Sequence, residues 1–254
     1  MNDYRRFKVV LTTLLAIAGV IVLIRLGIWQ LDRLKWRRTF NSHYLQQVAM
    51  PALFLNESVE DPVLIDSEYR QVRAKGHYDF GGEVYLQNQA FQNQPGFRAL
   101  TPYVLDGSEM VVYVDRGWIG MDAIETMDEI NQNAEGEQEI SGVIRLPQQR
   151  NSFGIDPDAE KSPDSRFWMI VNLERLQERE SRTVLPIYIQ LTKKETSNLP
   201  IPVPNEIEIS EGPHMGYAIQ WFFFATLLAG GYPFFLRKIL NTPSKRKEIV
   251  DDDY

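Results

Sequence analysis

Residues 9–24 read VVLTTLLAIAGVIVLI, and the apolar character continues past Arg25 as far as Trp29. A helix over residues 9–29 rises about 31 Å at 1.5 Å per residue, close to the ~30 Å hydrocarbon core of a bilayer. A second run, at 215–236, reads MGYAIQWFFFATLLAGGYPFFL and carries aromatic side chains toward both ends, as expected near lipid headgroups. The sequence therefore predicts two transmembrane helices in a lipid bilayer, separated by a long segment.

The alternative for the first run is a cleaved signal peptide, which requires small residues at a cleavage site. The run continues instead into RLGIWQ at 25–30, which favours an uncleaved anchor. No transit peptide rich in arginine and serine precedes the run, and this favours a bacterial membrane over that of an organelle.

The formal net charge of the 254 residues is −7, but the charges are unevenly distributed. Residues 39–212 hold 14 basic and 28 acidic side chains, whereas residues 1–38 hold 8 basic and 2 acidic ones. An acidic centre argues against a nucleic-acid binder, which needs a cationic surface. Basic residues before the first run and after the second predict that both termini are cytoplasmic and that the acidic centre lies outside. A basic cluster beyond the first run favours the opposite orientation: Arg25, Arg33, Lys35, Arg37 and Arg38.

The segment between the two runs has mainly the pattern of strands. We expect strands at 69–77, 83–87, 99–105, 110–115, 138–145, 167–171 and 185–192, a hairpin turn at Asp106-Gly107, a loop over 147–163 and a short helix at 172–180. The predicted fold class is α+β, with two transmembrane helices flanking a mostly antiparallel β extracytoplasmic domain. The predicted boundaries are 1–8 for a cytoplasmic N-terminus, 9–29 for the first transmembrane helix, 30–50 for a juxtamembrane helix, 51–212 for a periplasmic β-rich domain, 213–236 for the second transmembrane helix and 237–254 for a cytoplasmic tail.

Residues with the usual chemistry of active sites are few. The chain has no cysteine, which excludes disulfides, thiolate metal sites and cysteine nucleophiles, and it has no P-loop, GxGxxG or GxSxG motif. His43 falls in the juxtamembrane helix, where a packing or solvated role is the simplest interpretation. His77 and Asp79 provide two ligands, fewer than a metal site requires. The sequence therefore predicts a protein that is not an enzyme.

The third histidine, His214, stands at the outer end of the second apolar run, where an imidazole is costly without a partner. Helical spacing places His214, Tyr217 and Trp221 on one face. This face is suited either to stack a flat aromatic macrocycle or to form an ordinary helix–helix seam. For His214 itself, the residues alone favour an interfacial polar cap over a ligand. On the first helix, Arg25 and Trp29 share a face, where the alternative to a ligand pocket is a cation–π pair.

Four segments carry a resemblance to a known family. They are LGIWQLDRLKW at 26–36, YRQV at 69–72, DRGWI at 115–119 and PHMGYAIQWF at 213–222. In this order, and between two apolar runs, they resemble the surfeit locus protein one family, which comprises membrane factors for cytochrome c oxidase assembly. The resemblance covers nearly the whole chain. It implies a bacterial member that crosses the inner membrane twice and assists the catalytic subunit of the oxidase together with other assembly factors.

The resemblance also implies a cofactor, since bacterial members of this family are thought to bind haem a. The histidine of the family corresponds to His214, which becomes the candidate axial ligand of a transiently bound haem a. In this hypothesis Tyr217 and Trp221 pack against the ring, and Arg25 or Arg33 pairs with its propionates.

Two further motifs of the family match residues of this chain. Its aromatic-Gln pair corresponds to Trp29-Gln30, and its Arg-Gly-Trp motif to 116–118. Asp115 stands where the family usually has asparagine.

Three other functions compete with haem a delivery. The first is a cofactor-free interaction scaffold that stabilises an oxidase assembly intermediate. The second is an enzyme that modifies haem, which would need further ligands or flavin motifs. The third is copper delivery, which the absence of cysteine disfavours.

Overall fold

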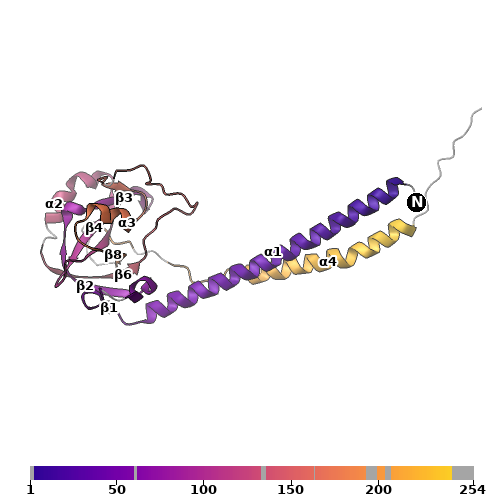
Figure 1. Cartoon of the computed structure of the whole chain (residues 1–254), viewed down its shortest axis with the longest axis horizontal. Coiled ribbons are helices and arrows are strands. Elements are labelled where there is room, and N and C mark those ends of the chain that lie inside the picture. Colours follow the sequence, from indigo (N-terminus) through magenta and orange to yellow (C-terminus); the bar gives the residue numbers. More distant parts are fainter. Residues whose placement is uncertain are drawn as a thin grey trace, which may run out of the picture. The chain divides into compact units, whose positions relative to one another are not determined.

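The computed structural model describes residues 3–59, 62–132, 136–162, 164–192, 199–203 and 207–241. The chain divides into two compact units, which we describe separately. The helical unit comprises Met1–Ser42 with Ile209–Tyr254, and the β-rich unit comprises His43–Glu208. In the helical unit, helices α1 (Asp3–Ala49) and α4 (His214–Asn241) lie side by side (Figure 1, indigo and yellow). Both are long and apolar enough to cross a membrane.

The strands of the β-rich unit form one sheet in the order β1-β2-β6-β8-β5-β4-β3-β7. Their bounds are β1 Leu53–Phe54, β2 Gln71–Tyr78, β3 Val84–Phe91, β4 Gln94–Leu105, β5 Val111–Gly120, β6 Gln138–Arg145, β7 Phe167–Trp168 and β8 Val184–Leu191. Two short α-helices, α2 (Met127–Gln132) and α3 (Leu173–Arg179), and four 3₁₀ turns, η1 (Leu55–Glu57), η2 (Pro62–Ser67), η3 (Phe80–Gly82) and η4 (Asp122–Thr126), complete the described part of the unit.

An additional pairing between β2 and β4 closes the sheet into a barrel formed by β2, β6, β8, β5 and β4. At the closure Gly76 of β2 lies opposite Leu105 of β4. A Cβ atom at position 76 would stand 1.9 Å from the backbone oxygen of Val104, so only glycine allows the two strands to approach this closely. The barrel is filled by a cluster of apolar side chains that includes Val72, Val114, Ile140, Ile144 and Ile189.

The expected α+β class is confirmed, and most predicted elements are present. The strand predicted at 138–145 coincides with β6, and the predicted hairpin turn joins β4 to β5, with Gly107 at a positive φ of 78°. Antiparallel pairs predominate, but β1–β2, β3–β7 and β5–β8 are parallel.

Several boundaries differ from the prediction. β5 extends beyond its predicted end at Asp115 as far as Gly120. The sequence pattern does not predict this extension, because polar side chains that are buried in the structure interrupt the run of apolar residues. β7 is shorter than expected. β1 and α2 were not predicted. Residues 30–49 continue α1 without a break, since the helical pattern is not interrupted between the apolar run and the juxtamembrane segment. The predicted tail falls mostly outside the described residues, which end at 241.

Candidate functional site

Small residues form much of the contact between α1 and α4 in the helical unit. Gly27 lies so close to Phe222 that a Cβ atom on it would approach the ring to 2.7 Å, and Gly19 faces Leu228 in the same manner. Small residues at such positions let two membrane helices pack closely. Farther along the same seam, the Tyr232 hydroxyl lies 2.6 Å from Thr13 Oγ1.

A second polar contact between the two helices lies in the same seam. His214, the first residue of α4, has its Nδ1 atom 2.8 Å from Oε1 of Gln30 on α1. Gln30 is 9% exposed, and a buried amide of this kind requires a partner. The contact engages Nδ1 and not Nε2, the other ring nitrogen, and His214 as a whole is partly exposed.

Gly212 lies beside Nε2 and Cδ2 of the ring. Its φ is +68°, and a Cβ atom at this position would come within 3.2 Å of both atoms. Glycine therefore lets the segment before α4 pass this edge of the imidazole without a side chain crowding it.

Two aromatic residues are predicted beside His214. Of these, Trp221 lies toward the contact between α1 and α4, whereas Tyr217 lies away from it. Trp221 is half-buried, and its Nε1 atom is enclosed without a hydrogen-bond partner among the described residues. Tyr217 is 46% exposed.

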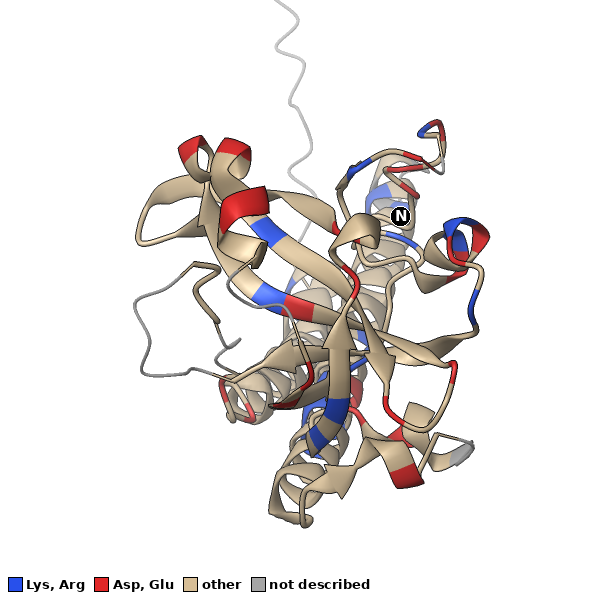
Figure 2. Ribbon diagram, turned by 90° about the vertical axis from the view of Figure 1, so that its left-hand side faces the viewer, with Lys and Arg blue, Asp and Glu red and all other residues tan. Residues whose placement is uncertain are grey.

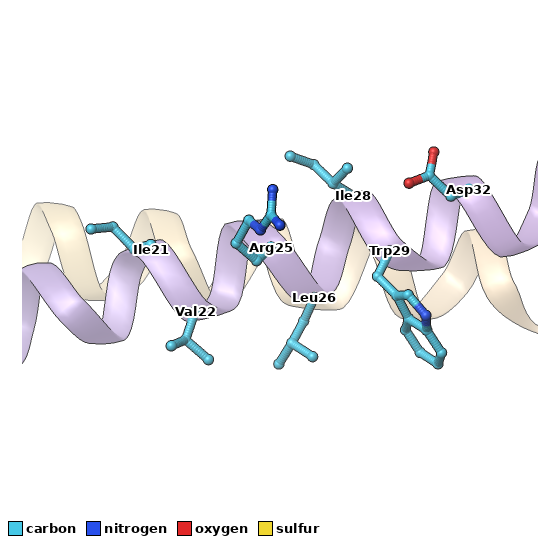
Figure 3. A pocket seen from close by; sticks show the side chains of 7 residues that line it. All are labelled: Ile21, Val22, Arg25, Leu26, Ile28, Trp29 and Asp32. Carbon is cyan, nitrogen blue, oxygen red and sulfur yellow. The ribbon is translucent and has the colours of Figure 1, made fainter.

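Arg25 and Trp29 lie on the outside of α1 and line one open recess of about 440 Å³ together with Asp32. Figure 3 shows the Arg25 guanidinium and the Trp29 ring pointing to different sides of the helix, so the cation–π pair considered for them is not formed. His214, Tyr217 and Trp221 do not line this recess.

Arg33 lies over the ring of Trp36 at 4.4 Å, and its position on α1 is exposed. Just beyond Arg33, the Arg37 guanidinium donates to the backbone oxygen of Ser210, and Arg38 forms a bidentate ion pair with Glu211. The hydrogen bonds from Arg38 hold the pKa of the Glu211 carboxyl below its usual range. These contacts fasten the segment before His214 to α1.

An apolar recess of about 280 Å³ lies elsewhere between the two helices, where Leu228 and Tyr232 face Ile17 and Val20. Leu228 is 14 residues from His214, or about 21 Å along a helix. The recess therefore does not belong to the surroundings of His214.

In the β-rich unit, Arg116 of the Arg-Gly-Trp motif belongs to a buried polar network. Arg116 donates to Glu83 at 2.8 Å and to Asn131 at 2.6 Å. Glu83 is 1% exposed and also accepts from Thr101, Tyr85 and Asn131. Every oxygen of this buried carboxylate is satisfied, which is the arrangement of a structural network.

The neighbouring residue Asp115 pairs with Arg98 of β4 through two contacts, at 3.0 and 2.8 Å. Asp115 also accepts from the backbone N–H of Gly117. Burial raises the pKa of the Asp115 carboxyl, and the guanidinium of Arg98 opposes that shift. At this position the carboxylate joins β5 to β4.

Acidic side chains are spread over the loops and strand ends of the β-rich unit (Figure 2). Within the described ranges, no group of three or more His, Asp or Glu side chains is suited to hold a metal ion. His77 and Asp79 therefore remain a pair of polar residues, and Asp79 is engaged by Arg182.

The local sequence pattern does not predict the contacts of two buried polar residues. The sequence identifies Gln30 only as part of an aromatic-Gln pair, although a glutamine beside an apolar run signals the need for a polar partner. The strand pattern places Glu83 at the start of a strand. Its burial depends on contacts with residues from 18 to 48 positions away, which no local pattern reveals.

Known proteins are similar to this chain over most of its length. Residues 17–226 match the model of a family described as the SURF1 family. A SURF1-like protein of Rickettsia bellii is 25% identical over 249 residues, which cover 95% of this chain and 98% of that protein. Surfeit locus protein 1 of Rattus norvegicus is 24% identical over 86% of this chain and 72% of its own length. The cytochrome oxidase assembly protein SHY1 of Saccharomyces cerevisiae is 25% identical over 170 residues, 65% of this chain but only 42% of the yeast protein.

Proposed function

Because the chain belongs to the SURF1 family, we propose that it is a membrane-bound assembly factor for cytochrome c oxidase that holds haem a for insertion into the catalytic subunit. The match covers more than three quarters of the chain, and the name of the yeast relative assigns that protein to cytochrome oxidase assembly. The partners are the catalytic subunit of the oxidase and other assembly factors.

The proposed location is a bacterial inner membrane, crossed by α1 and α4, with both termini in the cytoplasm and the β-rich unit in the periplasm. Two apolar helices of sufficient length support the membrane location. The basic residues before the first apolar run and after the second support the orientation, because Lys and Arg near the ends of a span are retained on the cytoplasmic side.

The observation that carries the haem proposal is the geometry of His214. Its Nδ1 atom is engaged by Gln30, and the residue beside Nε2, Gly212, has no side chain of its own. A neutral imidazole in this state offers one lone pair, and haem iron takes such a nitrogen as an axial ligand. A single protein ligand suits a carrier, since the cargo has to leave again.

The remaining parts of the haem molecule meet residues of fitting chemistry on the same unit. Trp221, half-buried on α4, would pack against the ring, and the exposed Arg33 would pair with a propionate. Tyr217 is exposed, and Arg25 and Trp29 line a recess that His214 does not share, so these three residues are not placed around the ring. The surrounding lipid takes up the long hydrocarbon tail. The proposed role is binding and transfer, without a catalysed reaction.

The test is the haem content of the protein purified in mild detergent from cells that make haem a. We expect the reduced absorption spectrum of haem a with the wild type and with the control variant His43→Ala, and at least a tenfold loss with His214→Ala. Equal haem content in the wild type and His214→Ala would overturn the ligand assignment.

A cofactor-free scaffold is the second candidate, and one loop of the β-rich unit favours it. Phe153 and Ile155 are 88% and 63% exposed, and their backbone N–H groups both donate to Oδ1 of Asn151, which fixes the loop that displays them. Exposed apolar side chains on an ordered loop are typical of contact sites between proteins. If a haem-free preparation retains an oxidase subunit, and Phe153→Ser releases it, this second function is favoured.

A further inference from the structure

The residue that orients the His214 ring comes from the other helix of the unit. Gln30 and His214 are 184 positions apart in the chain, yet Gln30 Oε1 and His214 Nδ1 lie 2.8 Å from each other. We propose that Gln30 is a positioning residue, whose amide oxygen accepts the Nδ1 proton and so holds His214 in the tautomer with a free lone pair on Nε2. This inference rests on the proposed function and deepens it.

The proton balance of the contact supports this assignment. A neutral imidazole carries one N–H, and the hydrogen bond that one nitrogen makes decides which of the two holds it. An amide oxygen only accepts, so its contact with Nδ1 places the proton there and leaves Nε2 as the acceptor. Histidines that bind a metal commonly donate their other N–H to such a partner, which fixes the ring orientation and raises the basicity of the ligating nitrogen.

The packing around Gln30 holds the amide in place. Gln30 is 9% exposed, and the nearby residues Gly27 and Leu34 on the same stripe of α1 are also buried. On the other helix, Ala218 follows His214 by one turn and is 1% exposed. A side chain enclosed in this way has few rotamers to lose when it makes its hydrogen bond, so the bond orients the ring effectively.

The segment before His214 is also fastened to α1. Arg38 pairs with both carboxylate oxygens of Glu211, and Arg37 donates to the carbonyl of Ser210. These contacts place the start of α4 against α1, and Gly212 adds no side chain beside Nε2. Because the hydrogen bond to Gln30 uses Nδ1, Nε2 is the ring nitrogen that remains for a ligand.

The tautomer of His214 is measured directly by ¹⁵N NMR spectroscopy, in the absence of haem. The protein is labelled with ¹⁵N-histidine in detergent, at about pH 8.5 where an ordinary imidazole is neutral. The chain has three histidines, and the signals of His214 are assigned by their absence from His214→Ala. We expect the Nδ1–H form in the wild type. In Gln30→Leu, which has a similar volume but no acceptor, we expect the Nε2–H form that free histidine favours in water.

Two further variants separate the hydrogen bond from a loss of packing. Gln30→Glu keeps an acceptor at the same place and is expected to retain the Nδ1–H form. Gln220→Leu makes the same substitution at an exposed position of α4 and is expected to leave the spectrum unchanged. A wild type in the Nε2–H form, or a Gln30→Leu variant with unchanged tautomer, would overturn the proposal.

The same variants are then titrated with haem a. Removing such an orienting partner typically weakens metal binding 10- to 100-fold, so we expect a loss of about that size in Gln30→Leu and a smaller one in Gln30→Glu. If Gln30→Leu changes the tautomer of His214 as expected, but neither the wild type nor any variant binds haem a, the positioning role stands and the proposed haem function fails. If haem binds equally to all variants, Gln30 does not position the ligand.

Discussion

Arg116 illustrates how much of the stability of this protein depends on single buried side chains. It is 6% exposed, and its charge is opposed by Glu83, itself 1% exposed. The guanidinium also lies over the rings of Tyr78 and Phe80, at 5.1 and 4.9 Å. Burial in this environment raises the pKa of the Tyr78 hydroxyl to about 12. Arg116 therefore links the carboxylate of Glu83 to the aromatic residues around η3.

Replacing Arg116 by methionine should strongly destabilise the β-rich unit. The substitution keeps an unbranched side chain but leaves Glu83 buried without its counter-charge, a change that typically costs about 3–5 kcal/mol. The free energy of unfolding is measured by titration with urea in detergent, with near-UV circular dichroism as the signal. Arg73→Met is the matched control, because the Arg73–Glu139 pair is exposed and should contribute less than about 1 kcal/mol. If Arg116→Met lowers the free energy of unfolding no more than Arg73→Met does, Glu83 finds another partner in the variant and the prediction is wrong.

Glu180 provides a test of pH dependence at the same scale. Its carboxylate accepts from Nε of Arg182 at 2.8 Å and from a terminal guanidinium nitrogen at 2.8 Å, and these hydrogen bonds lower its pKa from 4.5. The unfolded chain then binds more protons than the folded one just below pH 4.5, so this contribution to stability is present above that pH and is lost as the pH falls through the lowered value.

Glu180→Gln should therefore flatten the dependence of unfolding free energy on pH below about 4.5. The wild type is expected to be the more stable protein at pH 7, and the difference should shrink at pH 3. Urea unfolding at several pH values measures this, with Glu178→Gln on α3 as the control for an amide substitution. A difference that stays constant down to pH 3 would contradict the assignment.

At the scale of elements, the α1–α4 seam depends on close approach. Gly27 and Gly19 face Phe222 and Leu228, and Ala218 and Ala225 are buried on α4. Lipid offers no hydrophobic force to bring two helices together, so tight packing and a few polar contacts have to provide the attraction. The Gln30–His214 contact lies in this seam and depends on its spacing.

Gly27→Ile is expected to weaken the helix pair by about 1–3 kcal/mol, because the added side chain meets the Phe222 ring. Titration with SDS, followed by circular dichroism, measures the loss. Phe222→Ala in the same chain should restore part of the stability by making room. Gly216→Ile is the control, since a Cβ there meets nothing within 4 Å. Equal effects at positions 27 and 216 would mean that the seam is not tightly packed in the membrane.

At the scale of the whole molecule, charge distribution and apolar helices together define the proposed topology. The helical unit carries the two apolar helices, and the segment between them carries twice as many acidic as basic side chains. In the proposed topology, basic residues beyond the outer ends of the two apolar runs keep both termini in the cytoplasm, and the β-rich unit lies outside it. Because the chain has no cysteine, a single introduced cysteine reports its location without background.

Glu109→Cys, in the β4–β5 turn, should react with a membrane-impermeant maleimide in intact spheroplasts. Asn241→Cys, the last residue of α4, should react only after the membrane is permeabilised. Both variants serve as each other's control, since both have to label fully in permeabilised cells. Labelling of Asn241→Cys alone in intact spheroplasts would invert the proposed orientation.

The sequence by itself determined the two apolar helices and most strands of the β-rich unit. These features are encoded locally: an apolar run of some 20 residues needs no partner to be recognised, and alternation with a turn such as Asp106-Gly107 specifies a hairpin within a dozen residues. The position of His214 at the start of a helix was equally readable, because it depends only on its place beside an apolar run.

Only the tertiary structure decided which surfaces meet. The closure of the barrel at Gly76, the parallel pairing of β5 with β8, the burial of Glu83 and the contact of Gln30 with His214 all join residues far apart in the chain. Such contacts depend on the packing of complete elements, and a buried polar residue is indistinguishable in sequence from an exposed one until its partner is placed. The partner of His214 is therefore a property of the folded helix pair.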